Sequence, residues 1–159
     1  MEKNELFHLI LSIVICQMAG IIGSIFMASS VASWYPTLVK PSFTPPGSYI
    51  GLIWIVLFTL MGISLFLIWR ETPGNSAVRI ALYFFAAQLI VNVLWNVAFF
   101  GMQSPISGLV VIVVLWILIL INMIKFWPIN RTAALLLIPY IVWVSIAAYL
   151  NYSILRLNP

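Results

Sequence analysis

The side chains of this sequence that could recognise a ligand are amides and indoles, and the amides recur with helical spacing. Six residues each lie three, four or seven positions from at least two of the others and therefore share one helical face: Gln88, Asn92, Trp95, Asn96, Phe99 and Gln103. Because an uncharged amide in apolar surroundings needs hydrogen-bond partners, we expect this face to point into a helix bundle. Two interpretations remain open: the amides either join neighbouring helices or line a pocket and offer donors and acceptors to a ligand.

Tryptophan is the second kind of side chain with an informative pattern. Three of the seven tryptophans lie at the ends of apolar runs, where an interfacial role explains them: Trp34, Trp69 and Trp127. Four lie deeper, where each indole N–H needs an acceptor: Trp54, Trp95, Trp116 and Trp143. Trp54 and Phe58 are four residues apart, as are Trp143 and Ala147. Interior indoles beside small residues and amides could enclose a flat aromatic ligand, although any one of them is also explained by core filling.

Charged and metal-based chemistry has little support in the sequence. No acidic or basic residue lies in the middle of an apolar run, which argues against a proton relay or an ion-coupling site. His8 is the only histidine and Cys16 the only cysteine, so we expect neither a multi-ligand metal site nor an intrachain disulfide. The sequence has no phosphate-binding loop, no nucleophile motif and no basic cluster for nucleic acid, and we expect no obligatory cofactor.

The elements that must position these residues are membrane-spanning helices. Only 6% of the 159 residues are charged and 64% are hydrophobic, whereas soluble domains carry about 25% charged residues. Most of the surface must therefore face lipid. Apolar runs of about 20 residues, the length that crosses a bilayer, predict an all-α integral membrane protein with a five-transmembrane-helix bundle in one domain, 1–159. The expected spans cover 6–29, 49–69, 78–100, 106–125 and 132–155.

The connection between the first two spans, 30–48, is long for so small a protein. It contains three aromatic residues and four prolines, which favour a stiff lid packed over the bundle. With five spans, one side of the membrane carries Lys3, Arg70, Arg79, Lys125 and Arg131, and the other carries Lys40 and Arg156. This excess of basic residues predicts a cytoplasmic N-terminus, with the lid and the C-terminus outside.

Three smaller patterns concern packing and lipid contact. Pro139 lies inside the fifth span and should bend that helix. Small residues recur along the first span and suit either close packing within the bundle or a dimer seam: Ala19, Gly20, Gly23, Ser24 and Ala28. Leu150, Tyr152 and Arg156 match a proposed cholesterol motif, which is a weak indication because an interfacial Tyr and Arg also anchor a helix end.

Three longer segments carry a family resemblance. They are WYPTLVKPSFTPPGSYIGLIW at 34–54, QLIVNVLWNVAFFG at 88–101 and PYIVWVSIAAYLNY at 139–152. With them, from about 20 to 156, the chain resembles the family of tryptophan-rich sensory proteins and translocator proteins (TSPO), also called peripheral-type benzodiazepine receptors. The short termini with few basic residues are similar to those of bacterial members. We therefore expect a bacterial plasma membrane protein for which cholesterol is not the native ligand.

The resemblance implies a membrane receptor or sensor, often a homodimer, with a ligand pocket inside the bundle beneath the first loop. The implied ligands are tetrapyrroles such as protoporphyrin IX and haem, and isoquinoline carboxamide or benzodiazepine-type drugs. The implied ligand-binding residues are Tyr35, Trp54, Phe58, Gln88, Asn92, Trp95, Trp143 and Ala147. Trp54 and Trp143 would also be catalytic if bound porphyrin is degraded in the presence of light and oxygen. The alternative is a transporter of porphyrins, lipids or sterols, although no internal repeat or buried charge supports coupled transport.

Overall fold

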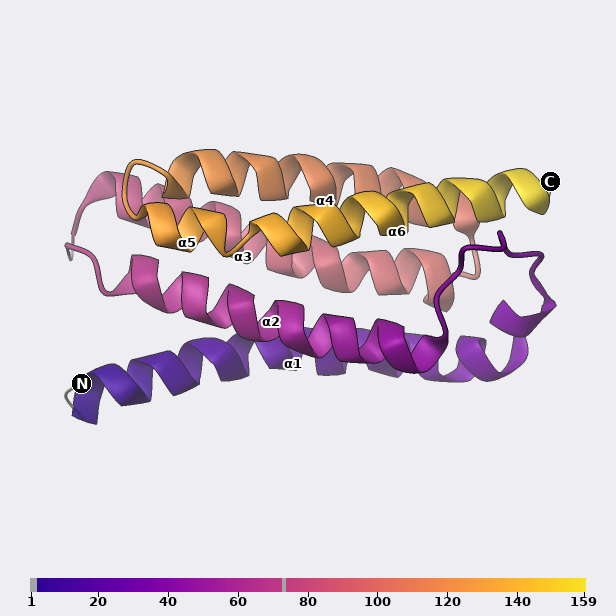
Figure 1. Ribbon diagram of the computed structural model, residues 1–159, viewed down its shortest axis with the longest axis horizontal. Coiled ribbons are helices and arrows are strands. Elements are labelled where there is room, and N and C mark those ends of the chain that lie inside the picture. Colours follow the sequence, from indigo (N-terminus) through magenta and orange to yellow (C-terminus); the bar gives the residue numbers. More distant parts are fainter. Residues whose placement is uncertain (1–2, 73) are drawn as a thin grey trace.

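The computed structural model describes residues 3–72 and 74–159 and shows a bundle of helices (Figure 1). The long helices are α1 (Lys3–Ser33), α2 (Gly47–Trp69), α3 (Ser76–Asn96), α4 (Pro105–Phe126) and α6 (Ile138–Leu157). The shorter elements are η1 (Tyr35–Thr37), η2 (Val97–Gly101) and α5 (Arg131–Leu135). Within these residues all regular structure is helical, and five segments are long and apolar enough to cross a membrane. The predicted fold class is therefore confirmed, and each expected span lies within one of the five segments.

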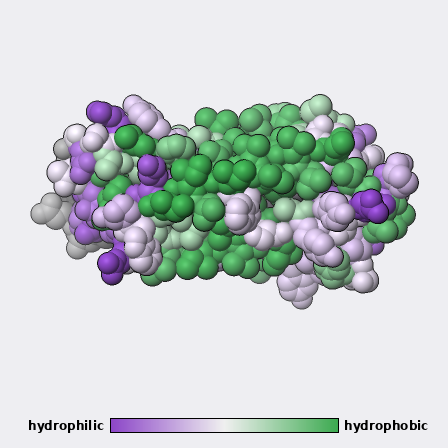
Figure 2. Space-filling view, turned by 90° about the horizontal axis from the view of Figure 1, so that it is seen from above, coloured by the Kyte–Doolittle hydropathy of each residue, from purple (hydrophilic) through white to green (hydrophobic). Residues whose placement is uncertain are grey.

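The long helices lie side by side along one axis, and the start of α1 and the end of α6 lie at opposite ends of the bundle (Figure 1). Figure 2 shows hydrophobic residues across the middle of this rod and hydrophilic residues gathered at its two ends. Such a surface suits a protein whose middle faces hydrocarbon and whose ends face water. Exposed apolar side chains such as Phe7, Ile25 and Val110 are therefore lipid contacts.

Glycines determine how closely α1 approaches its neighbours. A Cβ on Gly20 would lie 2.6 Å from the Phe58 ring on α2, and a Cβ on Gly23 would lie 2.7 Å from Asn96 Nδ2 on α3. Only a hydrogen atom fits at these two positions without moving a neighbour. Gly20 and Gly23 thus serve packing within the bundle, whereas Ser24 is exposed.

Pro139 interrupts the fifth span, which is divided into α5 and α6. Proline has no N–H with which to continue a helix. Before the break, α5 packs on α2, where Ser64 Oγ donates to the carbonyl of Ala133 (2.7 Å). After the break, α6 packs mainly on α4, where Trp116 Nε1 donates to Ser145 Oγ (2.8 Å). Because α5 contacts both α2 and α4 whereas α6 stays mainly on α4, the loss of the contact with α2 leaves a wedge between α2 and α6.

The third span ends in a π-helix rather than continuing as an α-helix. The Met102 N–H donates to the carbonyl of Val97, five residues earlier (2.8 Å). The wider turn rotates the residues that follow, and both Phe99 and Phe100 are buried. Beyond this turn, Gln103 has a φ of 50° and an exposed side chain. Gln103 therefore lies at the edge of the bundle, where its Nε2 donates to Ser30 Oγ of α1 (3.5 Å), and not inside the bundle as predicted for the whole amide face.

The lid, residues 34–46, is attached to the end of α6. The Val39 N–H donates to Asn158 Oδ1 (3.0 Å), and Asn158 Nδ2 donates to the Val39 carbonyl (2.9 Å). Phe43 stacks on Tyr149 with ring centroids 5.5 Å apart. These contacts tie the middle and the far end of the lid to one helix, so the lid covers this end of the bundle.

Beneath the lid, aromatic side chains pack together around Phe99. The Tyr35 ring centroid lies 6.4 Å from that of Phe99 and 5.7 Å from that of Phe100, and Trp95 stacks on Phe99 at 5.6 Å. Lys40 Nζ lies 4.6 Å from the centre of the Tyr35 ring and donates to the Tyr35 carbonyl (2.9 Å). Burial raises the pKa of the Tyr35 phenol, so the phenol stays neutral at physiological pH.

Candidate ligand-binding site

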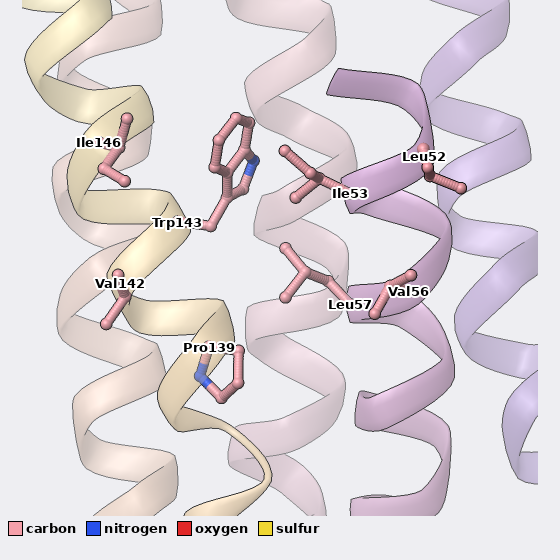
Figure 3. Close-up of a pocket in the computed structure, with 8 residues that line it drawn as sticks. All are labelled: Leu52, Ile53, Val56, Leu57, Pro139, Val142, Trp143 and Ile146. Atoms are coloured by element: carbon pink, nitrogen blue, oxygen red, sulfur yellow. The ribbon is translucent and has the colours of Figure 1, made fainter. Parts of the chain in front are cut away.

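A groove runs between α2 and α6 where these helices diverge (Figure 3). Its volume is about 410 Å³, which is within the range of small-molecule sites. Its lining comprises Leu52, Ile53, Val56, Leu57, Pro139, Val142, Trp143 and Ile146. Leu57 and Trp143 are buried at its floor, whereas Leu52, Val56 and Val142 are exposed at its rim. The groove therefore opens toward the hydrocarbon of the bilayer.

Trp143 gives this apolar groove its one indole. The side chain projects from α6 toward Ile53 of α2 (Figure 3). Only 9% of the residue is exposed, and its Nε1–H has no hydrogen-bond partner among the described residues. A buried donor without an acceptor costs about 1–3 kcal/mol. The groove thus offers an occupant the aromatic face of Trp143, and the buried N–H behind this face lacks an acceptor.

Tyr140 is the centre of a hydrogen-bonded cluster in the core. Asn92 Nδ2 donates to the Tyr140 hydroxyl (2.8 Å), and this hydroxyl donates to Gln88 Oε1 (2.8 Å). All three residues are at most 2% exposed. Gln88 Nε2 has no partner within the described chain and is a second buried donor without an acceptor. Trp54 meets the Tyr140 ring edge-on at 6.3 Å and stacks on Phe58 at 5.5 Å, so the cluster connects α2, α3 and α6.

The eight residues implied by the family resemblance lie in three neighbourhoods. Trp143 lines the groove, and Ala147 is buried one turn further along α6. Four residues gather around Tyr140, namely Trp54, Phe58, Gln88 and Asn92. Tyr35 and Trp95 lie in the aromatic packing beneath the lid. Because Tyr140 and Trp143 are three residues apart on α6, the first two neighbourhoods adjoin each other.

Two residues with central hydrogen bonds, Tyr140 and Asn151, were not among the candidate site residues taken from the sequence. Asn151 Oδ1 accepts from Trp95 Nε1 (3.2 Å), and Asn151 Nδ2 donates to the carbonyl of Pro105 (2.7 Å). Both residues share a buried face of α6 with Ala147, at steps of seven and four positions. This helical spacing could have identified them, because the same kind of spacing identified the amide face of the third span.

The amide face is largely used for packing between and along helices. Asn92 joins α3 to α6 through Tyr140, and Asn96 Nδ2 donates to the backbone carbonyl of Asn92 (3.3 Å) while facing Gly23 of α1. The interpretation as a pocket wall retains support at Gln88, whose amide nitrogen lacks an acceptor. The hydrogen bonds therefore assign Asn92 and Asn96 to packing, whereas contact of Gln88 with a ligand stays a prediction.

The residues of the sterol-like motif do not share one environment. Leu150 is buried, whereas Tyr152 and Arg156 are exposed. An interfacial anchor formed by the tyrosine and the arginine needs only the two exposed residues. The geometry therefore adds nothing specific to sterol recognition.

The segments that build the groove and the Tyr140 cluster are shared with known proteins. A family model described as TspO/MBR matches residues 12–157. The chain belongs to the TspO/MBR family. It is 43% identical to the tryptophan-rich protein TspO of Chlorobaculum tepidum, over 99% of each chain. It is 35% identical to the tryptophan-rich sensory protein of Cereibacter sphaeroides, over 79% of this chain and 77% of that one. It is 32% identical to the translocator protein of Sus scrofa, over 89% and 84%.

In this TspO/MBR member the candidate site is electrically neutral. The described residues include no group of three or more His, Cys, Asp or Glu side chains that could hold a metal ion. The groove and the Tyr140 cluster combine aromatic faces with amide, phenol and indole hydrogen-bonding groups. Such a site suits the binding of an apolar aromatic molecule better than acid–base catalysis.

Proposed function

We propose that the protein is a membrane receptor or sensor that binds a flat aromatic ligand against Trp143, in the groove and toward the Tyr140 cluster. The observation that carries the proposal is Trp143, which lines the groove and whose buried N–H has no acceptor among the described residues. Tetrapyrroles such as protoporphyrin IX and haem provide a flat apolar ring with acceptor groups, as do isoquinoline carboxamide and benzodiazepine-type drugs on a smaller scale. The name of the Cereibacter relative, a sensory protein, is consistent with ligand detection.

Trp143→Phe should weaken the binding of protoporphyrin IX by about 1 kcal/mol, or roughly fivefold, because the aromatic ring remains while the N–H donor is lost. The measurement is a fluorescence titration of the purified protein in lipid nanodiscs. Trp116→Phe is the matched control, since Trp116 donates to Ser145 outside the groove. Absence of saturable binding by the wild type would refute the proposed function. Equal affinities of wild type and Trp143→Phe would place the ligand away from Trp143.

Illumination of the same complexes separates a receptor from a protein that degrades its ligand with light and dioxygen. An indole is an easily oxidised donor to an excited porphyrin, which makes Trp54 and Trp143 the candidate catalytic residues. If the protein is only a receptor, light should bleach the bound porphyrin at the same rate in the wild type, Trp54→Phe and Trp143→Phe. Photodegradation should give a defined product from the wild type, and its yield at saturating porphyrin should collapse in at least one variant.

Transport of a porphyrin, lipid or sterol is a second candidate function. It is favoured by the exposed rim of the groove at Leu52, Val56 and Val142, through which an apolar molecule could pass between bilayer and site. The Sus scrofa relative is named a translocator protein. Uptake of porphyrin into proteoliposomes, compared with empty liposomes, tests this function directly.

The orientation that we propose has the start of α1 in the cytoplasm of a bacterium and the lid outside its plasma membrane. One end of the bundle carries Arg70, Arg79, Lys125 and Arg131, and the other carries Lys40 and Arg156. Basic residues accumulate on the cytoplasmic side of membrane proteins. A reporter fused after Pro159 should therefore be active only outside the membrane, and one fused before Met1 only inside. A cytoplasmic reporter at the C-terminus would reverse the orientation and place the lid inside the cell.

The homodimer that the family resemblance implies remains part of this proposal. Gly20 and Gly23 contact Phe58 and Asn96 of the same chain, so they are not free for a partner. The seam of a dimer would therefore have to lie on other lipid-facing side chains.

A further inference from the structure

A second groove lies toward the opposite end of the bundle from the lid, between α1 and α3. Its volume is about 240 Å³, and its lining comprises Ile15, Leu65, Trp69, Leu82, Phe85, Ala86 and Leu89. Ile15 belongs to α1, Leu65 and Trp69 belong to α2, and the other four residues belong to α3. Leu65 and Phe85 are buried, whereas Ile15 and Ala86 are exposed, so this groove also opens toward lipid.

The groove exists because α1 follows α2 and leaves α3. Near the lid, Gly23 brings α1 against α3, and Ser30 Oγ donates to the carbonyl of Phe100 (2.6 Å). Toward the other end α1 stays on α2, where a Cβ on Gly62 would lie 2.5 Å from Ile13 Cα. Figure 1 shows the first turns of α1 alongside α2, at the edge of the bundle. Ile15 is the α1 residue that lines the groove this divergence leaves, and His8 of α1 packs against Trp69 with ring centroids 5.3 Å apart.

Two arginines lie next to the end of this groove. Arg70 follows Trp69 directly at the end of α2, and Arg79 lies one turn before Leu82 at the start of α3. Both arginines are exposed. Arg70 Nη1 lies 4.0 Å from Glu5 Oε1, with side chains that are 51% and 43% exposed. An ion pair this exposed contributes little and leaves the guanidinium available to another anion.

We propose that this groove binds an anionic phospholipid of the bilayer, with an acyl chain against Phe85 and Ala86 and the phosphate at Arg70 and Arg79. The α3 wall from Leu82 to Leu89 is about 10 Å long, which suits a stretch of acyl chain that runs from the interface toward the membrane centre. An apolar groove between helices with a basic rim is the arrangement that recognises acidic headgroups. The site is independent of the ligand proposed for the α2–α6 groove.

The charges around the rim favour an anionic over a zwitterionic lipid. Apart from Glu5, the acidic side chain of the described chain is Glu71, whose Oε1 accepts from Asn130 Nδ2 (3.1 Å) and so faces α5. A zwitterionic headgroup would bring a cation next to both arginines. Each of the two arginines at the rim, Arg70 and Arg79, is expected to contribute about a fivefold preference for an anionic headgroup bound in the groove.

The test is native mass spectrometry of the protein released from nanodiscs that contain equal amounts of phosphatidylglycerol and phosphatidylcholine with the same acyl chains. We expect the wild type to retain phosphatidylglycerol preferentially. Arg70→Gln and Arg79→Gln should each reduce this preference about fivefold. Glu5→Gln should increase it, because the carboxylate that competes for Arg70 is removed. Arg131→Gln, at the same end of the bundle on α5, is the control and should leave the preference unchanged.

The groove itself is tested with Ala86→Phe, which should fill it and lower the retention of both lipids. Val110→Phe, on the lipid-facing side of α4, is the matched control. Ala86→Leu serves as a smaller filling if the phenylalanine lowers the yield of folded protein. Equal retention of the two lipids by the wild type would overturn the proposal. So would a loss in Arg131→Gln as large as that in Arg70→Gln, or unchanged retention in a folded Ala86 variant.

Discussion

Replacing Gly62 by Leu should force α1 away from α2 and lower the free energy of unfolding by about 3 kcal/mol or more. A Cβ at Gly62 would lie 2.5 Å from Ile13 Cα and 2.9 Å from Ile13 N. These are backbone atoms of a long helix, so no rotation of a side chain can relieve the clash. Thermal unfolding of the purified protein in detergent, followed by circular dichroism, measures the loss.

Gly51→Leu is the matched control on the same helix. Gly51 is exposed, and no atom lies within 4 Å of a Cβ at this position. Leucine is the better helix former, so this variant should unfold at or slightly above the temperature of the wild type. If Gly62→Leu and Gly51→Leu unfold at the same temperature, α1 and α2 do not approach each other as closely at Ile13 as described.

The transmembrane helices could be predicted from the sequence because hydrocarbon leaves the backbone few choices. A long apolar segment in lipid must form hydrogen bonds with its own N–H and carbonyl groups. A helix forms these bonds within the segment itself and needs no other part of the chain. Pro139 could be predicted to disturb its helix for an equally local reason, since proline lacks the donor that a helix requires.

The groove between α2 and α6 could not be predicted in the same way. Pro139 predicts a bend, but the direction of the bend depends on tertiary contacts, here Ser64 with Ala133 before the break and Trp116 with Ser145 after it. The environment of Gln103 was also missed, because it depends on a π turn that no simple spacing rule indicates.

Both grooves have a common physical origin in divergent helices. At Gly62 the α2 helix lies so close to α1 that an added Cβ would be 2.5 Å from Ile13 Cα, and at this end of the bundle α1 has left α3. The same helix holds α5 through Ser64, after which α6 leaves α2. Gly62 and Ser64 are neighbouring small residues on α2, and their tight contacts are followed by openings on opposite sides of that helix. The arrangement provides an indole-lined groove toward the lid and an arginine-rimmed groove at the other end.

Tyr140→Phe should have the second large effect, a loss of about 2 kcal/mol in the free energy of unfolding. The substitution removes the hydroxyl that accepts from Asn92 and donates to Gln88, and it leaves both amides buried without that partner. The aromatic ring remains, so the contact with Trp54 at 6.3 Å should persist. Tyr149→Phe, at an exposed position of the same helix, is the control and should be close to neutral.

A double-mutant cycle with Asn92→Leu shows whether the loss comes from the hydrogen bond itself. Leucine suits the membrane interior, and Asn92→Leu removes the donor to Tyr140. Once that donor is gone, removing the hydroxyl should cost less than in the wild type, so the two changes together should cost less than the sum of the single losses. Strictly additive losses would mean that Asn92 and Tyr140 contribute independently. The porphyrin affinity per folded molecule then shows whether the Tyr140 cluster contacts the ligand. Unchanged affinity in both variants indicates a purely structural role. A loss of affinity in Asn92→Leu places the ligand within reach of this amide.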